Sequence, residues 1–408
     1  MNRPVPVDQH RADVAALLAP LVAQRPVQRV PLAEALDRVL GADVVAPVAV
    51  PAFRNSQMDG FAVRAADVPD GGARLAVVAE VPAGSGEPAP LAPGTAARIM
   101  TGAPVPAGAD AVVPVEATTL GRFTAGERPA QVDVLDAVAA GAFVREAASD
   151  VAAGDVVLPA GTEMGPAQVA AVAACGLAQV EVVVPLRVAV VSTGSEIVAP
   201  GEALGPGQVY DANGPALAAA VRRAGGTVAL EARCGDDADA LAAALADAAL
   251  VADLVVTSGG VSQGAYEVVK DVLAGTSTVE FRSVAMQPGG PQGLGRHRGT
   301  PLLAFPGNPV SAQVSFVVFL RELIEAGAGR AARSGERHER RRLQSGTTSP
   351  AGRRQLLRGA LGPGGSVRVV GGPGSHLVAS MARADVLIDV PPGTTELAAG
   401  DEVEVWPL

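Results

Sequence analysis

Three short glycine-containing segments are the parts of this sequence best suited to chemistry. They are residues 193–196 (TGSE), 258–264 (SGGVSQG) and 306–311 (PGNPVS), and each follows an apolar run that predicts a buried strand. Glycine allows the backbone to approach a ligand closely, and free amides at the start of a helix attract phosphate. One such segment is a weak signal, but three at successive strand ends favour a phosphate-containing ligand. None has the spacing GxxxxGK[ST], which disfavours a P-loop nucleotidase.

Acidic residues gather around the same segments. They are Glu196, Asp211, Asp236, Asp237 and Glu267. One interpretation is helix capping, which Asp236 and Asp237 suit because an alanine-rich helix is predicted to follow them. The other is a carboxylate site for Mg²⁺, a cation that prefers oxygen ligands and usually bridges to phosphate. The residues alone leave both interpretations open.

Two earlier segments have no evident structural purpose. They are residues 55–62 (NSQMDGFA) and 98–113 (RIMTGAPVPAGADAVV). The pair Asp59 and Gly60 also suits an ordinary turn. Chemistry alone therefore does not rank Asp59 above the other aspartates that are predicted to lie in turns.

The elements that must position these residues follow from the apolar pattern. Residues 8–40 predict two short helices, the second with Pro31 at its first turn. Residues 47–140 hold short β-branched runs between Gly and Pro clusters, a pattern typical of a small barrel or sandwich. Over residues 186–327 buried strands alternate with amphipathic helices, which predicts a parallel α/β sheet that binds ligands at the carboxyl ends of its strands. Residues 328–345 predict a linker, and a small β domain follows.

The composition limits the class of protein. The 408 residues include 32 Lys and Arg against 42 Asp and Glu, and the net charge of −10 argues against a nucleic-acid-binding chain. Cys175 and Cys234 are too few for a disulfide framework or a Cys-type zinc site, so a reducing cytosol is expected. The first residues lack the apolar core of a signal peptide, and no run of about 20 apolar residues is uninterrupted. We therefore expect a soluble protein.

Six motifs in one order resemble a known family. SQMDGFAVR, RIMTGAPVPAGADAVV, STGSEI, GQVYDANG, TSGGVSQG and PGNPVSA occur as they do in the molybdopterin molybdenumtransferases, the molybdenum insertases, to which the E domain of gephyrin is similar. The resemblance covers residues 8–408. It implies a multidomain α/β fold with a central parallel α/β molybdopterin-binding domain, an N-terminal helical plus β region and a C-terminal small β-barrel.

The resemblance also implies how the chain is divided. A discontinuous helical N-terminal region would occupy residues 1–46 and 141–180, around a β-rich inserted domain at 47–140. The α/β molybdopterin-binding domain would occupy 181–327, and the C-terminal β-barrel domain 328–408. The family implies a homodimer whose active cleft is shared between subunits.

The activity implied by the resemblance is insertion of molybdenum from molybdate into adenylylated molybdopterin, with Mg²⁺-dependent release of AMP. The product is the molybdenum cofactor. Mg²⁺, molybdopterin as the adenylylated substrate, and molybdate are therefore the expected cofactors and ligands. The adenylyltransferase and apo-molybdoenzymes are further implied partners, nucleic acid and membrane are not, and the implied location is the cytoplasm.

Matching motif positions imply the site residues one at a time. Catalytic roles are implied for Asp59, Thr101, Asp150, Glu196, Asp236, Glu267 and Lys270, and metal binding for Glu196, Asp211 and Asp236. Cofactor binding is implied for Thr193, Gly194, Ser258, Gly259, Gly260, Ser262, Gly264, Pro306, Gly307, Asn308, Pro309, Ser311, Arg358 and Ser375. His376 is a further candidate beside molybdate.

The sequence departs from the family pattern at several of these places. The family often has KPGKP where this chain has Gln287 and Gly290 in place of the two lysines, which weakens the expected molybdate site. Ser195 replaces the usual aspartate of the TGDE motif. Lys270 is the single lysine among the 32 basic residues, and because arginine does not replace a compact ammonium, we expect Lys270 to be functional.

Two other functions remain as alternatives. The chain could be a molybdopterin-binding paralogue that acts as a carrier or scaffold without insertase activity, which the missing lysine pair favours. It could also be the adenylyltransferase that makes the substrate, although the predicted extra domains at both ends argue against this. The retained acids favour the insertase.

Overall fold

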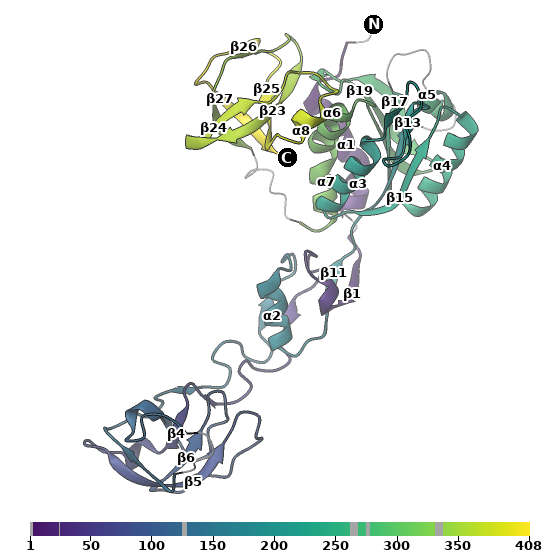
Figure 1. Cartoon of the computed structure of the whole chain (residues 1–408). Helices are drawn as coiled ribbons and strands as arrows, with labels where there is room; N and C mark the ends of the chain where they lie inside the picture. Colours follow the sequence, from purple (N-terminus) through teal and green to yellow (C-terminus); the bar gives the residue numbers. More distant parts are fainter. Residues whose placement is uncertain (1–2, 24, 125–128, 262–267, 275–277, 331–337) are drawn as a thin grey trace. The chain divides into compact units, whose positions relative to one another are not determined.

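The computed structural model describes residues 3–23, 25–124, 129–261, 268–274, 278–330 and 338–408. They form two compact units (Figure 1). Unit 1 comprises Met1–Arg29, Asp37–Gly41 and Glu181–Leu408, and unit 2 comprises Val30–Leu36 and Ala42–Val180. The expected division into four regions is finer than these two units and stays a prediction.

A six-stranded sheet forms the centre of unit 1, in the order β15-β12-β16-β20-β19-β17. The first four strands are parallel, β19 pairs antiparallel with β20 at one edge, and β17 pairs antiparallel with β19. The predicted parallel α/β core is thus confirmed, but as part of a mixed sheet. The strands are β12 (Arg187–Thr193), β15 (Thr227–Cys234), β16 (Leu254–Ser258), β17 (Glu280–Ser283), β19 (Pro291–His297) and β20 (Thr300–Phe305).

Helices cover both faces of this sheet (Figure 1). Alternate side chains of β12 point to opposite faces, so Val188 and Val190 join one core cluster and Ala189 and Val191 the other. On the first face lie α1 (Val7–Ala23), α3 (Asn213–Arg223), α6 (Pro309–Ser315), the π-helix η4 (Phe316–Leu320) and α7 (Arg321–Gly327). On the second lie α4 (Ala238–Val251) and α5 (Val268–Leu273). A short pair, β13 (Ile197–Val198) and β14 (Val209–Tyr210), precedes α3.

The C-terminal part of unit 1 is a small closed β-barrel, as predicted. Its strands follow one another as β23-β24-β21-β27-β25, and pairing of β25 with β23 closes the ring. Alternate apolar residues, such as Val386, Ile388 and Val390, fill the interior. The bounds are β21 (Glu339–Leu343), β23 (Arg354–Gly362), β24 (Ser366–Val369), β25 (Val386–Val390) and β27 (Glu402–Pro407), with β18 (Met286–Gln287), β22 (Thr347–Thr348), β26 (Glu396–Leu397), η5 (Pro363–Gly365) and α8 (Val378–Met381) beside them.

Unit 2 has a five-stranded sheet in the order β7-β4-β6-β5-β8, with an apolar cluster on each side. The strands are β4 (Gly60–Val63), β5 (Ala73–Val81), β6 (Thr95–Ile99), β7 (Ala111–Pro114) and β8 (Gln131–Val134). The shorter elements are β2 (Val44–Val45), β3 (Asn55–Ser56), β9 (Val144–Arg145), β10 (Val156–Leu158), α2 (Pro166–Ala174), η2 (Ala65–Asp67) and η3 (Val115–Ala117). The predicted helical plus β character of the N-terminal half is confirmed.

The second helix predicted after Pro31 is wrong. Val27–Pro31 forms β1, which pairs with β11 (Gln179–Val183), and only the 3₁₀ turn η1 (Leu32–Glu34) follows. A partner strand far along the chain supplies hydrogen bonds that the local pattern does not reveal, and the β-branched Val27 and Val30 suit a strand.

Candidate functional site

The three glycine-containing loops meet at the carboxyl edge of the parallel strands. Gly259 N–H donates to the carbonyl of Phe305 over 3.1 Å. A Cβ atom on Gly259, which has φ +106°, would lie 2.4 Å from the carbonyl oxygen of Thr193, and one on Gly307 would lie 3.3 Å from Gly259 Cα. Only glycine at residue 259 allows this backbone contact, so the predicted residues Thr193, Gly259 and Gly307 are brought together.

Two of the predicted acids lie on adjacent loops. Ser195 and Asp236 bond reciprocally: Asp236 N–H donates to Ser195 Oγ (3.0 Å) and Ser195 N–H to Asp236 Oδ2 (3.4 Å). Glu196 folds back over Gly194, where a Cβ would meet its Oε2 at 2.5 Å. The loop has a serine where the family has an aspartate, which avoids placing a second carboxylate against Asp236.

Asp211 caps the start of α3. Its Oδ1 accepts from the first two backbone N–H groups of α3, those of Asn213 (2.9 Å) and Gly214 (3.0 Å). The capping interpretation of Asp211 therefore has direct geometric support. Sequence reasoning missed Asn213, whose Nδ2 donates to Ser258 Oγ and to the Gly307 carbonyl, both over 2.7 Å. The Asp-Ala-Asn-Gly string at a predicted helix start was the available signal.

A cavity of about 400 Å³ lies beside the loop that follows β20. Five predicted residues line it, Pro306, Gly307, Asn308, Ser311 and Ser375. The other lining residues are Val261, Gln287, Pro288, Gly289, Pro291, Pro373, Gly374 and His376. No lysine, arginine, aspartate or glutamate is among these lining residues from the described parts of the chain. The wall offers neutral amides and hydroxyls, with His376 as its titratable group.

Arg358 holds in place the loop that forms one wall of this cavity. Its guanidinium is 2% exposed and donates to the carbonyls of Val370 (3.4 Å), Gly374 (3.1 Å) and Gly372. Burial lowers the pKa of Arg358. Because its donors are directed at the loop that carries Ser375, the structure places Arg358 as the anchor of that loop.

The remaining predicted residues of unit 1 lie near α5 and α6. Gly260 approaches α5 closely, since a Cβ on it would be 2.6 Å from Val269 Cγ2. Lys270 is on α5, with Nζ 5.8 Å from the ring centroid of Phe281. Pro309 is the first residue of α6. Ser262, Gly264 and Glu267 lie outside the described residues.

In unit 2 the predicted residues Asp59 and Thr101 are joined. Asp59 Oδ1 accepts from Thr101 N–H (2.7 Å) and from Thr101 Oγ (2.8 Å), and both residues are on the surface. Asp150 is also exposed, and its N–H donates to the carbonyl of Val50. The carboxylate of Asp59 is thus oriented, whereas Asp150 is held through its backbone N–H.

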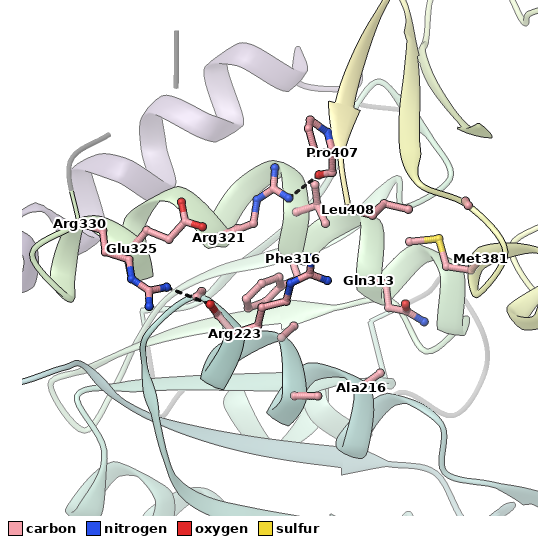
Figure 2. A pocket seen from close by; sticks show the side chains of 15 residues that line it. Ala216, Arg223, Gln313, Phe316, Arg321, Glu325, Arg330, Met381, Pro407 and Leu408 are labelled. Atoms are coloured by element: carbon pink, nitrogen blue, oxygen red, sulfur yellow. Dashed lines mark hydrogen bonds between the residues drawn. The ribbon is translucent and has the colours of Figure 1, made fainter. Parts of the chain in front are cut away.

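A larger cavity of about 760 Å³ contains none of the predicted site residues (Figure 2). It is bordered by α3, the helices after α6 and the last residues of the chain. Arg330 donates to the carbonyl of Arg223 and Arg321 to that of Pro407, so these arginines brace its walls. Its lining residues include none of the loop glycines or adjacent acids that the sequence analysis singled out.

The described residues contain no group of three or more His, Cys, Asp or Glu side chains arranged to hold a metal. Any bound cation would therefore take part of its coordination from a ligand or from residues outside the described ranges. No helix in the described part of the chain is long and apolar enough to cross a membrane.

Comparisons with known proteins agree along the whole chain. Residues 5–176 match the MoeA N-terminal region (domain I and II), residues 189–326 a probable molybdopterin binding domain, and residues 340–408 the MoeA C-terminal region (domain IV). Molybdopterin molybdenumtransferase 2 of Mycobacterium tuberculosis is 46% identical over 413 residues, which cover 98% of this chain and 99% of that one.

Another relative and two solved structures are also similar. Molybdopterin molybdenumtransferase 1 of the same organism is 37% identical, over 96% of each chain. Two structures of molybdopterin biosynthesis MoeA proteins from Pyrococcus horikoshii match with TM-scores of 0.79 and 0.75, at 31% and 26% identity. The first match covers 99% of both chains and the second 100%.

Proposed function

Because this chain belongs to the molybdopterin molybdenumtransferase family, we propose that it inserts molybdenum from molybdate into adenylylated molybdopterin and releases AMP. The names of its relatives support transfer of molybdenum to molybdopterin. The adenylylated form of the substrate, the release of AMP and the role of Mg²⁺ are the finer parts of the proposal.

The contact between the three glycine-containing loops carries this proposal. The glycines at this contact leave room for the phosphate groups of an adenylylated substrate to approach the backbone closely. Ser258, whose hydroxyl is already oriented by Asn213, is one of the buried polar side chains of this group. The substrate would lie with its phosphates over Gly259 and Gly307.

Glu196 and Asp236 are the residues proposed to hold Mg²⁺. Their donor atoms are carboxylate oxygens, which fits a cation that takes one or two carboxylates and completes its shell with phosphate and water. When bound, Mg²⁺ neutralises charge on the phosphate that leaves with AMP. Asp211, the third expected ligand, has one oxygen already bonded to the amides of α3, so we assign it to positioning that helix.

Molybdate is proposed to bind in the 400 Å³ cavity through neutral donors. The amides of Asn308 and Gln287 and the hydroxyls of Ser311 and Ser375 line it. Hydrogen bonds from neutral groups are individually weaker than those from lysine, roughly 0.5–1.5 against 1.5–3 kcal/mol. We therefore expect weaker molybdate binding than a site with two lysines would give.

One incubation separates the insertase from the carrier or scaffold function. The purified protein is mixed with adenylylated molybdopterin, Mg²⁺ and molybdate, and AMP release and reconstitution of an apo-molybdoenzyme are followed. The insertase releases AMP and forms active cofactor in a molybdate-dependent manner. Tight binding without turnover supports the carrier, which the neutral cavity wall favours. Asp236→Asn is the matched control, since it keeps the size of the side chain, removes a proposed Mg²⁺ ligand and should release little AMP.

The quaternary structure and location are proposals as well. We propose a homodimer in the cytoplasm with a cleft that both subunits complete, as the family resemblance implies. Light scattering on the purified protein measures the mass in solution. A monomer that retains full activity would contradict the shared cleft.

A further inference from the structure

Asn213 connects two of the three substrate loops, and nothing in its sequence motif assigns it a role. We propose that Asn213 is a positioning residue that sets the spacing of the loops after β16 and β20 around the substrate. This inference rests on the proposed function. The two hydrogens of Nδ2 are donated to Ser258 Oγ and to the carbonyl oxygen of Gly307, each over 2.7 Å. One amide group therefore bridges loops 49 residues apart in sequence.

Asn213 is itself held rigidly at the start of α3. Its N–H donates to Asp211 Oδ1 (2.9 Å), which also accepts from Gly214 N–H. A Cβ on Gly214 would lie 2.7 Å from Asp211 Oδ2 and 3.0 Å from Ser192 Oγ, so the helix packs this close only because residue 214 is glycine. The position of the bridging amide is thus fixed by the sheet edge and not by the loops that it joins.

A further bond closes the connection between the loops. Ser258 Oγ donates to the carbonyl of Pro306 over 3.3 Å, while Gly307, the next residue, accepts from Asn213. Ser258 is 1% exposed and Asn213 9%, so water cannot readily replace the hydrogen bond between their side chains. Removing the amide leaves the buried Ser258 hydroxyl and the Gly307 carbonyl without their donor.

The donor character of the amide is what this position requires. Asn213 Oδ1 is buried and has no hydrogen-bond partner in the described part of the chain, so the loop contacts come from Nδ2 alone. An aspartate has the same shape but offers only acceptors. It would face the Gly307 carbonyl with a second oxygen and would place a charge beside Asp211. Asn213→Asp is therefore the sharpest variant.

The test is a double-mutant cycle on the release of AMP from adenylylated molybdopterin. We expect Asn213→Asp and Ser258→Ala each to raise KM about tenfold, with kcat within about threefold of wild type. Because both changes break the same bridge, the double variant should be no more than about threefold worse than Asn213→Asp. An unchanged KM in Asn213→Asp would overturn the proposal. So would a KM in the double variant about 100-fold above wild type, because the two single effects would then be independent.

Controls separate a positioning role from general damage. Ser192→Ala removes a buried hydroxyl from the residue paired with Ser258, and that hydroxyl has no partner among the described residues, so KM should not change. Melting temperatures close to wild type show that the fold is intact. If Asn213→Asp does not fold, Asn213→Ala removes the donor without adding a charge and takes its place in the cycle.

A binding measurement distinguishes this proposal from the proposed function. If the wild-type protein releases no AMP, the proposed function fails, and the affinity for molybdopterin itself is measured by fluorescence titration. We still expect Asn213→Asp to bind about tenfold more weakly and Ser192→Ala to bind normally. Equal affinities for all three proteins would refute the positioning role.

Discussion

At the scale of single residues, the candidate site depends on the close backbone contacts that glycine allows and on a few oriented polar groups. Gly259 and Gly307 stand where a Cβ would meet the backbone of a neighbouring loop, and Gly194 stands where a Cβ would meet the Glu196 side chain of its own loop. The polar groups around them are held by local bonds, such as the reciprocal pair of Ser195 and Asp236. These residue types were visible in the sequence, but their contacts were not.

Lys270 carries the first prediction at this scale. Lys270→Arg should lower the rate of molybdenum insertion at least about tenfold, because a planar guanidinium does not replace a compact ammonium. The melting temperature should not change, since arginine can also lie over the Phe281 ring. Phe281→Leu is the control: it removes the ring, 5.8 Å from Nζ, and keeps the ammonium. Near-normal insertion by Lys270→Arg would show that only the charge is needed.

At the scale of elements, helices and loops are fixed by contacts with distant parts of the chain. The loop from Val370 to Ser375 is anchored by Arg358 on β23, and the Ser375 carbonyl accepts from Val310 N–H at the start of α6. The cavity wall is therefore assembled from the barrel and the α/β domain together.

Arg358 tests whether this anchor acts by charge or by geometry. Both Arg358→Lys and Arg358→Met should weaken molybdate binding by about tenfold, because neither can donate to three carbonyls at once. If Arg358 bound the oxyanion directly, lysine would restore most of the affinity and methionine would not. Calorimetric titration with molybdate gives the affinities. A near-wild-type affinity in Arg358→Lys would contradict the anchoring role.

His10 gives a pH dependence for the packing of α1. It is 1% exposed and meets the Phe319 ring of η4 edge to face at 4.6 Å. Burial, helped by the charge of Arg282, lowers the pKa of His10 to about 4. Below pH 6.5 the unfolded chain binds a proton that the folded chain does not, so stability should fall as the pH drops towards 4.

The matched comparison is with His10→Leu. Between pH 7 and pH 5 the wild-type protein should lose about 2 kcal/mol more unfolding free energy than this variant. Urea unfolding followed by the fluorescence of Trp406, the single tryptophan, measures the difference in unit 1. Parallel losses in the two proteins would show that His10 titrates normally in the folded state.

At the scale of the whole of unit 1, a partly buried ionic cluster links the first helix to the barrel. Arg354 on β23 contacts Asp389 of β25 through Nη2 (2.8 Å) and Asp8 of α1 through Nη1 (2.7 Å). Its guanidinium lies 5.8 Å from the centroid of Trp406. Asp389 is 4% exposed, so removing Arg354 leaves a buried carboxylate without its cation.

Breaking one side of this cluster should cost more than removing the pair. Arg354→Met should lower the unfolding free energy by about 3–5 kcal/mol, because it leaves the Asp389 carboxylate buried without a cation. Adding Asp389→Leu should recover a large part of that loss. Trp406 fluorescence during urea unfolding reports both proteins. A double variant less stable than Arg354→Met alone would show that the pair itself stabilises the barrel.

Much of the fold follows from local patterns. The apolar runs before the three glycine-containing segments predicted β12, β16 and β20, and the alanine-rich run after Asp237 predicted α4, because each carries its own local pattern. β19, with the sequence PQGLGRH, and β23 were not expected, since hydrogen bonds to neighbouring strands rather than their own residues make them strands. The mistaken helix after Pro31 has the same cause.

The sequence by itself determined the family, the parallel core and the residue types of the candidate site, because motif order and apolar periodicity are local properties. Tertiary structure alone decided which groups share a bond. In the folded chain Asp211 accepts hydrogen bonds from the amides of α3, Arg358 donates to three loop carbonyls, and Asn213 donates to two loops. A hydrogen bond needs its two atoms within about 3.5 Å and aligned, and spacing along a chain does not specify that distance.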